Sequence, residues 1–111
     1  MLVSISIEKA LGQLTSSALF TEVFQHGTLS VEIYCPDKTD RQTPHDRDEI
    51  YVIARGTGTF RCNEKETPFQ AGDFLFVPAF APHQFVDFSA DFSTWVFFYG
   101  PIGGEAKTTS I

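Results

Sequence analysis

Basic residues are scarce in this sequence. Eight Lys and Arg residues stand against fourteen Asp and Glu residues, which leaves a formal net charge of −6. The chain has no run of Lys or Arg that would neutralise successive phosphates, so we expect no nucleic-acid partner. A strongly acidic ligand would depend on one of three arginines in the central region, Arg41, Arg47 or Arg55.

Long hydrophobic runs are absent as well. The apolar runs reach only five residues, as at 95–99, whereas a membrane-spanning helix needs about 20. The N-terminal stretch has no basic segment ahead of an apolar one and carries Glu8, so it does not resemble a signal peptide. We therefore expect a soluble chain with no membrane partner.

Cysteine is almost absent. Cys35 and Cys62 are too few and too far apart for a disulfide scaffold or a zinc knuckle. We expect two buried thiols in a reducing compartment, which favours a cytoplasmic location. A bridge between them, or a metal role, is the alternative.

Aromatic residues, in contrast, are abundant. Twelve Phe, three Tyr and one Trp make up 14% of the 111 residues. Each ring buries on the order of 150–250 Å², so one sizeable core can form, whereas two cores would each be too small to be stable. The sequence predicts a single domain over residues 1–111.

The hydrophobic pattern predicts an almost entirely β structure. Apolar residues at helical spacing, interrupted by Gly12, predict one short helix at 7–14. Leu29, Val31 and Ile33 alternate with polar residues, as in a half-buried strand. Further strands are expected at 50–54, 59–62, 74–77, 83–88 and 94–99, and turns at 55–58 and 63–66.

About eight or nine short strands with turns every eight to twelve residues indicate a β-sandwich or barrel. We place its core at residues 19–100. The polar tail at 103–111 is expected to be loosely held.

Three of the predicted strands, 50–54, 74–77 and 95–99, are apolar on both faces. A strand in a small antiparallel barrel normally has one face in contact with water. We expect a second copy of the chain to cover these outward residues in a homodimer. Shielding by the N- and C-terminal segments is the alternative.

The positions of the three histidines are informative. His45 and Glu49 are four residues apart on the approach to a strand, an even separation that places both on one face, together with Tyr51. His83 opens another strand, after Pro82. Two imidazoles and a carboxylate from neighbouring strands would offer a metal one face of three ligands. A buried histidine and carboxylate pair with no metal is the alternative.

The spacing around these residues resembles the two motifs of the cupin superfamily. The first motif reads His-x-His, three or four residues, Glu, six residues, Gly, and it is matched at its end by His45, Glu49 and Gly56. The second reads Gly, five residues, Pro-x-Gly, two residues, His, three residues, Asn. It is matched by Gly72, Pro78 and His83.

This resemblance covers roughly residues 27–100, with fifteen residues, 57–71, between the motifs. The blocks QTPHDRDE and WVFFYGP also resemble a group of short single-domain cupins. The resemblance implies a jelly-roll barrel, often dimeric, with one divalent transition metal such as Fe, Mn, Ni or Zn in its mouth. His45, Glu49 and His83 would then be the metal ligands.

The sequence departs from the cupin pattern at three positions. Thr43 replaces the first histidine, Phe80 replaces the glycine of the second motif, and Asp87 replaces its asparagine. A threonine hydroxyl is a poor neutral ligand, so three of the four expected ligands remain. Gln42 is a candidate fourth ligand if Pro44 bends the chain, although it is out of register with the histidine on a regular strand.

These residues suggest a metal-dependent enzyme acting on a small, largely apolar or aromatic metabolite, of the oxygenase or the isomerase or decarboxylase type. Tyr51 or Arg47 would orient the substrate, although Arg47 can equally pair with Asp46 or Asp48. One rival is a barrel that binds or senses a small ligand without turnover. Another is a metal-free structural barrel.

Overall fold

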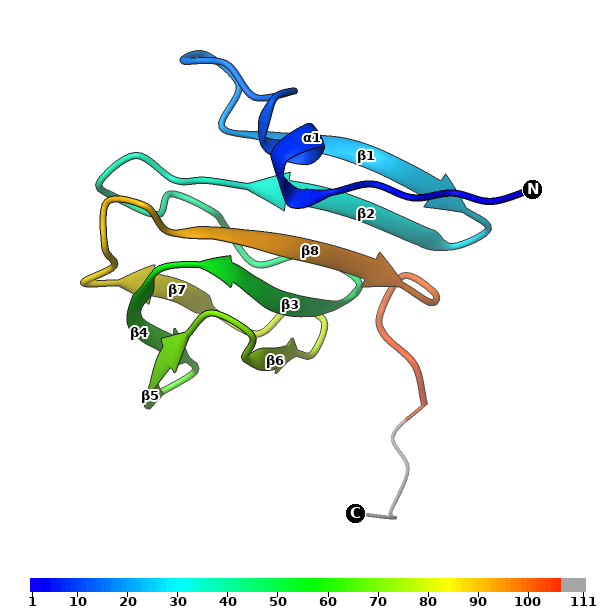
Figure 1. The fold of residues 1–111 in the computed structure, drawn as a ribbon. Helices are drawn as coiled ribbons and strands as arrows, with labels where there is room; N and C mark the ends of the chain where they lie inside the picture. The colour runs from blue at the N-terminus through cyan, green and yellow to red at the C-terminus, as the bar shows by residue number, and fades with distance from the viewer. Residues whose placement is uncertain (107–111) are drawn as a thin grey trace.

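The chain folds into two antiparallel sheets that face each other (Figure 1). The computed structural model describes residues 1–106. The larger sheet has the strand order β1-β2-β8-β3-β6, and the smaller sheet has the order β5-β4-β7. The elements are α1 (Ile7–Leu11), β1 (Phe20–His26), β2 (Leu29–Tyr34), β3 (Asp48–Arg55), β4 (Thr57–Cys62), β5 (Lys65–Gln70), β6 (Phe74–Val77), β7 (His83–Val86) and β8 (Ser93–Tyr99).

This arrangement confirms the predicted all-β jelly-roll barrel with a short N-terminal helix. Helix α1 is shorter than the predicted span of 7–14. Ser6 Oγ caps its first turn by accepting from the Lys9 N–H at 3.0 Å, and Gly12 ends it because glycine weakens a helix interior. Among residues 1–106, no helix has the length and apolarity needed to cross a membrane.

The sheets contain two strands that the sequence pattern does not predict, β1 and β5. In β1 the register shifts between Glu22 and Phe24, and this bulge breaks the alternation of faces. In β5 the predicted turn at 63–66 was too long. Asn63 adopts a φ of 55° and the chain enters the strand at Lys65. Pro68 is tolerated there because β5 lies at the edge of its sheet.

Aromatic rings fill the space between the sheets. The Phe85 ring lies at the centre, with centroid distances of 4.8 Å to Tyr51, 4.8 Å to Phe60 and 4.7 Å to Phe92. All four side chains are buried. Rings at these distances add to the free energy of burial by about 0.5–1.5 kcal/mol per pair, so the core explains part of the phenylalanine content, while Phe20, Phe74, Phe76 and Phe80 are exposed.

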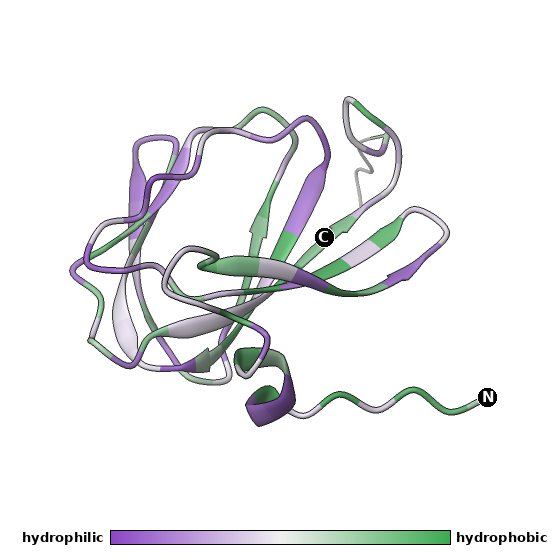
Figure 2. Cartoon of the chain, turned by 90° about the horizontal axis from the view of Figure 1, so that it is seen from above, coloured by the Kyte–Doolittle hydropathy of each residue, from purple (hydrophilic) through white to green (hydrophobic). Residues whose placement is uncertain are grey.

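The outward face of the larger sheet is also apolar. Val31 on β2 lies beside Phe97 on β8, which lies beside Ile50 on β3. The apolar N-terminal segment lies outside the barrel (Figure 2), and Val3 and Ile5 line a groove with Val31 and Phe97. The N-terminal segment therefore covers part of this face, which agrees with the alternative expectation that the terminal segments shield the outward apolar residues.

The cover does not extend over β6. Phe74 and Phe76 keep 63% and 46% of their surface exposed, and they pair with Val52 and Ile50 on β3. An apolar patch of this kind usually indicates an interaction surface.

The first part of the C-terminal tail is held against the barrel. The Gly103 N–H donates to the Asp46 carbonyl at 2.7 Å, and the Glu105 N–H donates to Asp48 Oδ2 at 2.8 Å. The prediction of a loose tail was therefore wrong for residues 103–105, because the backbone N–H groups of Gly103 and Glu105 donate hydrogen bonds to the barrel. Residues 107–111 lie outside the described part, and the single domain over 1–111 stays a prediction.

Asp48 is a buried carboxylate whose substitution should weaken the fold. It accepts from the Ala79 N–H at 3.0 Å as well as from Glu105. In Asp48→Asn, the amide keeps one acceptor oxygen and turns an NH₂ group toward a backbone donor. We expect the free energy of unfolding to fall by about 1–3 kcal/mol in a urea titration, whereas the exposed Asp46→Asn control should change little. Equal stabilities would contradict this assignment.

Candidate metal centre

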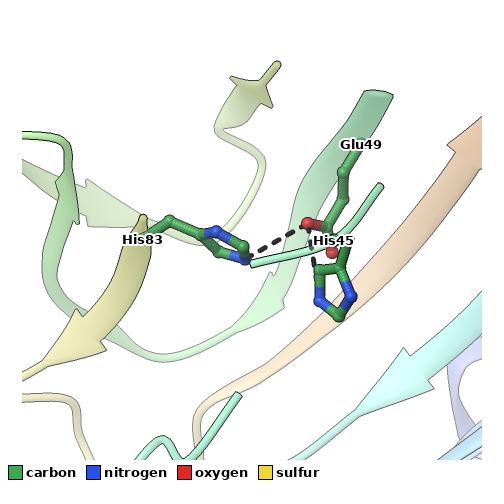
Figure 3. A group of neighbouring side chains, drawn as sticks. All are labelled: His45, Glu49 and His83. Atoms are coloured by element: carbon green, nitrogen blue, oxygen red, sulfur yellow. Dashed lines mark ion pairs between the residues drawn. The ribbon is translucent and has the colours of Figure 1, made fainter. Parts of the chain in front are cut away.

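Three side chains from separate parts of the chain converge between the sheets (Figure 3). Glu49 lies on β3 of the larger sheet, His83 opens β7 of the smaller sheet, and His45 lies in the loop 35–47. One ligand atom from each lies within 4.8 Å of the others. The structure therefore brings together the three residues that the sequence proposes as metal ligands.

His45 reaches the cluster by a different route from the one expected. It is in the loop that precedes β3, not on a strand, so the even spacing to Glu49 does not explain the convergence. Its carbonyl accepts from the Phe80 N–H at 2.6 Å, and its ring packs edge-on against Phe98 at a centroid distance of 4.9 Å. These contacts, rather than strand geometry, aim the imidazole.

Phe80 occupies the position where the cupin motif has glycine, and its backbone has a φ of 69°. This left-handed conformation costs a non-glycine residue about 1–2 kcal/mol, and the side chain regains little because it is 60% exposed. Phe80 closes the turn between β6 and β7, in which the Ala81 N–H donates to the Pro78 carbonyl at 3.1 Å. The turn is retained at the cost of backbone strain.

The Phe80→Gly variant should relieve this strain. Glycine also increases the conformational entropy of the unfolded chain, which costs about 0.5–1 kcal/mol of stability. Because relief of the strain is worth about 1–2 kcal/mol, we expect a net gain of up to about 1 kcal/mol in the free energy of unfolding. Phe80→Val, which is β-branched, should be less stable than the original chain. Urea titrations of both variants check this, and a loss of stability in Phe80→Gly would refute it.

His83 is held in one tautomer. Its Nδ1 donates to the Ala81 carbonyl at 2.9 Å, so the neutral ring directs the Nε2 lone pair toward Glu49 Oε1, 3.2 Å away. Burial lowers the pKa of His83, but the Glu49 carboxylate and the Ala81 carbonyl outweigh burial and raise it. An imidazole fixed in this way is ready to act as a ligand.

Glu49 is the least satisfied group in the cluster. It is 1% exposed, and both of its carboxylate oxygens lack a hydrogen-bond partner among the described residues, as does His83 Nε2. The two groups are near each other but poorly aligned for a hydrogen bond. A carboxylate buried without hydrogen-bond donors is costly, and the groups beside it are the rings of His83 at 3.2 Å and His45 at 3.9 Å, so these residues fit a bound cation.

The spacing of the cluster is slightly wide for a bound ion. Two ligand atoms each about 2.1 Å from one ion lie at most about 4.2 Å apart, and the cluster extends to 4.8 Å. His45 Nε2 is 3.9 Å from Glu49 Oε1 and its side chain is 33% exposed. A small inward movement of this half-exposed ring would close the cluster.

Gln42 lies next to the cluster. Its Oε1 is 3.5 Å from His45 Nε2 and accepts from the Tyr51 hydroxyl at 2.9 Å. The register objection to Gln42 does not hold, because Gln42 and His45 are both in a loop. Thr43, at the position of the missing histidine, is exposed at the cavity.

The two residues expected to orient a substrate are not at the cavity. Tyr51 is fully buried, and burial, followed by the charge of Glu49, raises the pKa of its hydroxyl well above the ordinary value. Arg47 donates to the Gly100 carbonyl at 3.1 Å and to the Thr28 carbonyl. It therefore fastens the ends of strands and does not pair with an aspartate among the described residues.

A cavity of about 680 Å³ opens beside His45 and Glu49. Its lining is mixed, with residues Ser17, Ala18, Leu19, Phe20, Glu32, Tyr34, Asp37, Thr39, Arg41, Gln42, Thr43, His45, Glu49, Val96 and Phe98. Burial, then the charges of Glu49 and Glu22, raise the pKa of Glu32. The volume suits a small organic molecule.

Glu32 is not singled out by the sequence pattern. The alternation in β2 correctly places Val31 and Glu32 on opposite faces of the strand, but it suggests that the polar face is in contact with solvent. In the structure both faces are enclosed, and the polar one lines the cavity. The signal was present in the neighbouring strand at 95–99, which is apolar on both faces and therefore requires the sheet to be covered on its outward face.

The two cysteines are free thiols. Cys35 donates to the Phe92 carbonyl at 3.3 Å, and burial raises the pKa of both thiols. They lie outside the metal cluster and form no bridge, but both are half-buried, not buried as the sequence suggested.

The fold and the site define a small jelly-roll barrel with a His/Glu cluster at one side of an open cavity. The cupin domain family model matches residues 30–94, and the chain belongs to the cupin family. It is 30% identical over 84 residues to SCO3923, an uncharacterized protein of Streptomyces coelicolor, an alignment that covers 74% of this chain and 80% of the relative.

Solved structures show the same fold. A cupin-2 domain containing protein from Shewanella frigidimarina has a TM-score of 0.68 at 12% identity, covering 86% of this chain and 94% of its own. A cupin 2 conserved barrel domain protein from Salinispora arenicola has a TM-score of 0.64 at 15% identity, covering 90% and 89%. At such identities the likeness concerns the fold alone.

Proposed function

We propose that this cupin holds one divalent transition metal and acts on a small, largely apolar or aromatic metabolite. The observation that carries the proposal is the buried and unpartnered state of the Glu49 oxygens and of His83 Nε2, next to a cavity large enough for an organic ligand. Imidazole and carboxylate ligands suit Fe, Mn, Ni and Zn, and such an ion would satisfy these atoms.

His45, Glu49 and His83 would hold the ion, and Gln42 Oε1 would add a fourth ligand in place of the histidine replaced by Thr43. The ion, when bound, supplies Lewis-acid or oxygen-activating chemistry, so oxygenase and isomerase or decarboxylase types fit equally. Tyr51 would help to orient Gln42, because its buried hydroxyl donates a hydrogen bond to Gln42 Oε1.

The cavity supports the class of ligand. Val96 and Phe98 supply apolar surface on β8, with the Phe98 ring against His45, while Arg41 and Glu32, which pairs with Val96, supply polar groups. A molecule with an apolar body and an oxygen donor at the metal end would fit this distribution.

Binding or sensing without turnover is the second candidate. The observation that favours it is the placement of Tyr51 and Arg47, neither of which lines the cavity. In that case the same centre and cavity would retain a small ligand unchanged.

Metal analysis of the purified protein tests the metal centre. We expect close to one equivalent of a first-row metal per chain, either as isolated or after reconstitution. Oxygen uptake with a panel of aromatic diols, and thermal shifts with the same compounds, then distinguish turnover from binding alone. A chain that takes up no metal would contradict the proposal and leave the metal-free structural barrel.

We further propose that the protein is a homodimer, joined through the exposed patch of Phe74 and Phe76. Light scattering should give about twice the chain mass of 12.4 kDa at micromolar concentration. The double variant Phe74→Ser/Phe76→Ser should be monomeric, because the apolar patch is lost. Phe20→Ser, which changes a phenylalanine of similar exposure, 60% against 63% for Phe74, should stay dimeric. A monomer before any substitution would refute the interface.

A cytoplasmic location remains part of the proposal. Its support is the pair of free thiols at Cys35 and Cys62, which suit a reducing compartment. Fractionation of cells that express the tagged protein would test it, and recovery outside the cytoplasm would contradict it.

A further inference from the structure

Asp40 is a buried carboxylate, 3% exposed, in the loop 35–47 that carries Gln42 and His45. Its Oδ1 accepts from the Tyr34 hydroxyl at 2.7 Å and from the Gln42 N–H at 3.1 Å. Its Oδ2 accepts from Gln42 Nε2 at 2.9 Å and from the Phe85 N–H at 2.8 Å. Four donors therefore converge on one charged group.

This carboxylate determines which way the Gln42 amide points. An ionised carboxylate only accepts hydrogen bonds, so the amide atom beside Asp40 Oδ2 must be the NH₂ group. The carbonyl oxygen Oε1 is then turned to the other side. There it lies 2.9 Å from the Tyr51 hydroxyl and 3.5 Å from His45 Nε2.

The same group fastens the loop to both sheets. Tyr34 ends β2 of the larger sheet, and Phe85 lies on β7, two residues after His83. The Asp40 carbonyl also accepts from Gln84 Nε2 on β7 at 3.1 Å. The loop that bears two members of the site is thus tied to the strand that bears a third.

We propose that Asp40 is the positioning residue of the metal centre, which holds the Gln42 amide with its oxygen toward the ion. The inference rests on the proposed metal function, since it specifies how the fourth ligand is aimed. Asp40 does not touch the ion itself, because its four contacts use both of its oxygens.

The Asp40→Asn variant tests the inference. An asparagine keeps one acceptor oxygen, so it cannot accept from the same four donors, and the Gln42 amide loses its fixed orientation. We expect the affinity for Co²⁺, measured by titration of the visible absorption, to fall about 10- to 100-fold, the usual effect of removing an outer-shell partner. The intensity of the Co²⁺ bands should change as well, because one ligand is lost.

Two comparisons separate positioning from general weakening. Asp48→Asn changes another buried carboxylate, 5% exposed, which accepts hydrogen bonds from backbone N–H groups and does not contact Gln42. This variant should lower the free energy of unfolding and leave the Co²⁺ affinity unchanged. In a Gln42→Leu background, Asp40→Asn should cause no further loss of affinity. An equal loss in both backgrounds, or a loss in Asp48→Asn of the same size, overturns the inference.

A measurement on the unaltered chain covers the case in which Asp40→Asn does not fold. The side-chain NH₂ signals of Gln42, assigned by their loss in Gln42→Leu, should exchange slowly with solvent and shift on addition of Zn²⁺. Signals that exchange fast and do not move would overturn the role of Asp40. Failure of the unaltered chain to bind Co²⁺ or Zn²⁺ at all overturns the metal centre, and the positioning role with it.

Discussion

The His83→Ala variant is expected to bind divalent metal at least about 100-fold more weakly than the unaltered chain. Loss of an outer-shell partner alone commonly costs 10- to 100-fold, and His83 is one of only three strong ligands in the cluster. Its ring is also the ligand held most firmly, through Nδ1 and the Ala81 carbonyl.

Calorimetric titration with Zn²⁺ measures this effect directly, and thermal unfolding reports it independently. At a metal concentration 100 times the dissociation constant, binding adds about 2.7 kcal/mol to the free energy of unfolding, or roughly 10 °C for a chain of this size. The variant should show no such shift. His26→Ala is the matched control, because this third histidine is exposed on β1, away from the cluster. Retention of metal by His83→Ala would contradict the assignment.

The Glu49→Gln variant is expected to be more stable than the unaltered chain when no metal is present. The substitution keeps the shape and removes a buried charge whose two oxygens have no hydrogen-bond partner among the described residues. The new NH₂ group can also donate to His83 Nε2, which lies 3.2 Å from the present Oε1. The desolvation penalty of a buried ion is several kcal/mol, and the uncharged amide avoids most of it.

Urea unfolding in the presence of a chelator, at pH 8, measures the gain. Glu66→Gln is a suitable control, because its carboxylate is half-exposed and pairs with Arg61 at the surface, where a salt bridge contributes about 0–1 kcal/mol. With saturating metal the order should reverse, since the amide is the weaker ligand. A Glu49→Gln variant that is less stable without metal would show that the carboxylate is already paired.

The three residues of the cluster could be selected from the sequence because their spacing is a local property of two motifs. Glu49 and His83 each belong to a strand, and the turn residues near them indicate where along the chain those strands begin and end. Apolar runs bounded by turn residues likewise predicted most of the strands. Signals of this kind depend on residues a few positions apart, so a single sequence contains them.

The positions of Gln42 and His45 could not be derived in the same way. The loop 35–47 has no period, and its path is fixed by contacts with distant residues, such as the bonds from Phe85 to Asp40 and from Phe80 to His45. The orientation of Arg47 has the same origin, because its partners lie on other strands. Such contacts leave no trace in local spacing.

The placement of two members of the site in one loop has a consequence for how this barrel can diverge. If the cluster holds an ion as proposed, a change at an exposed position of this loop, such as Thr43, would alter the groups next to the ion while the paired strands keep their register. Changes at Asp40 or Arg47 would not be tolerated in the same way, because these two residues fasten the loop to the strands.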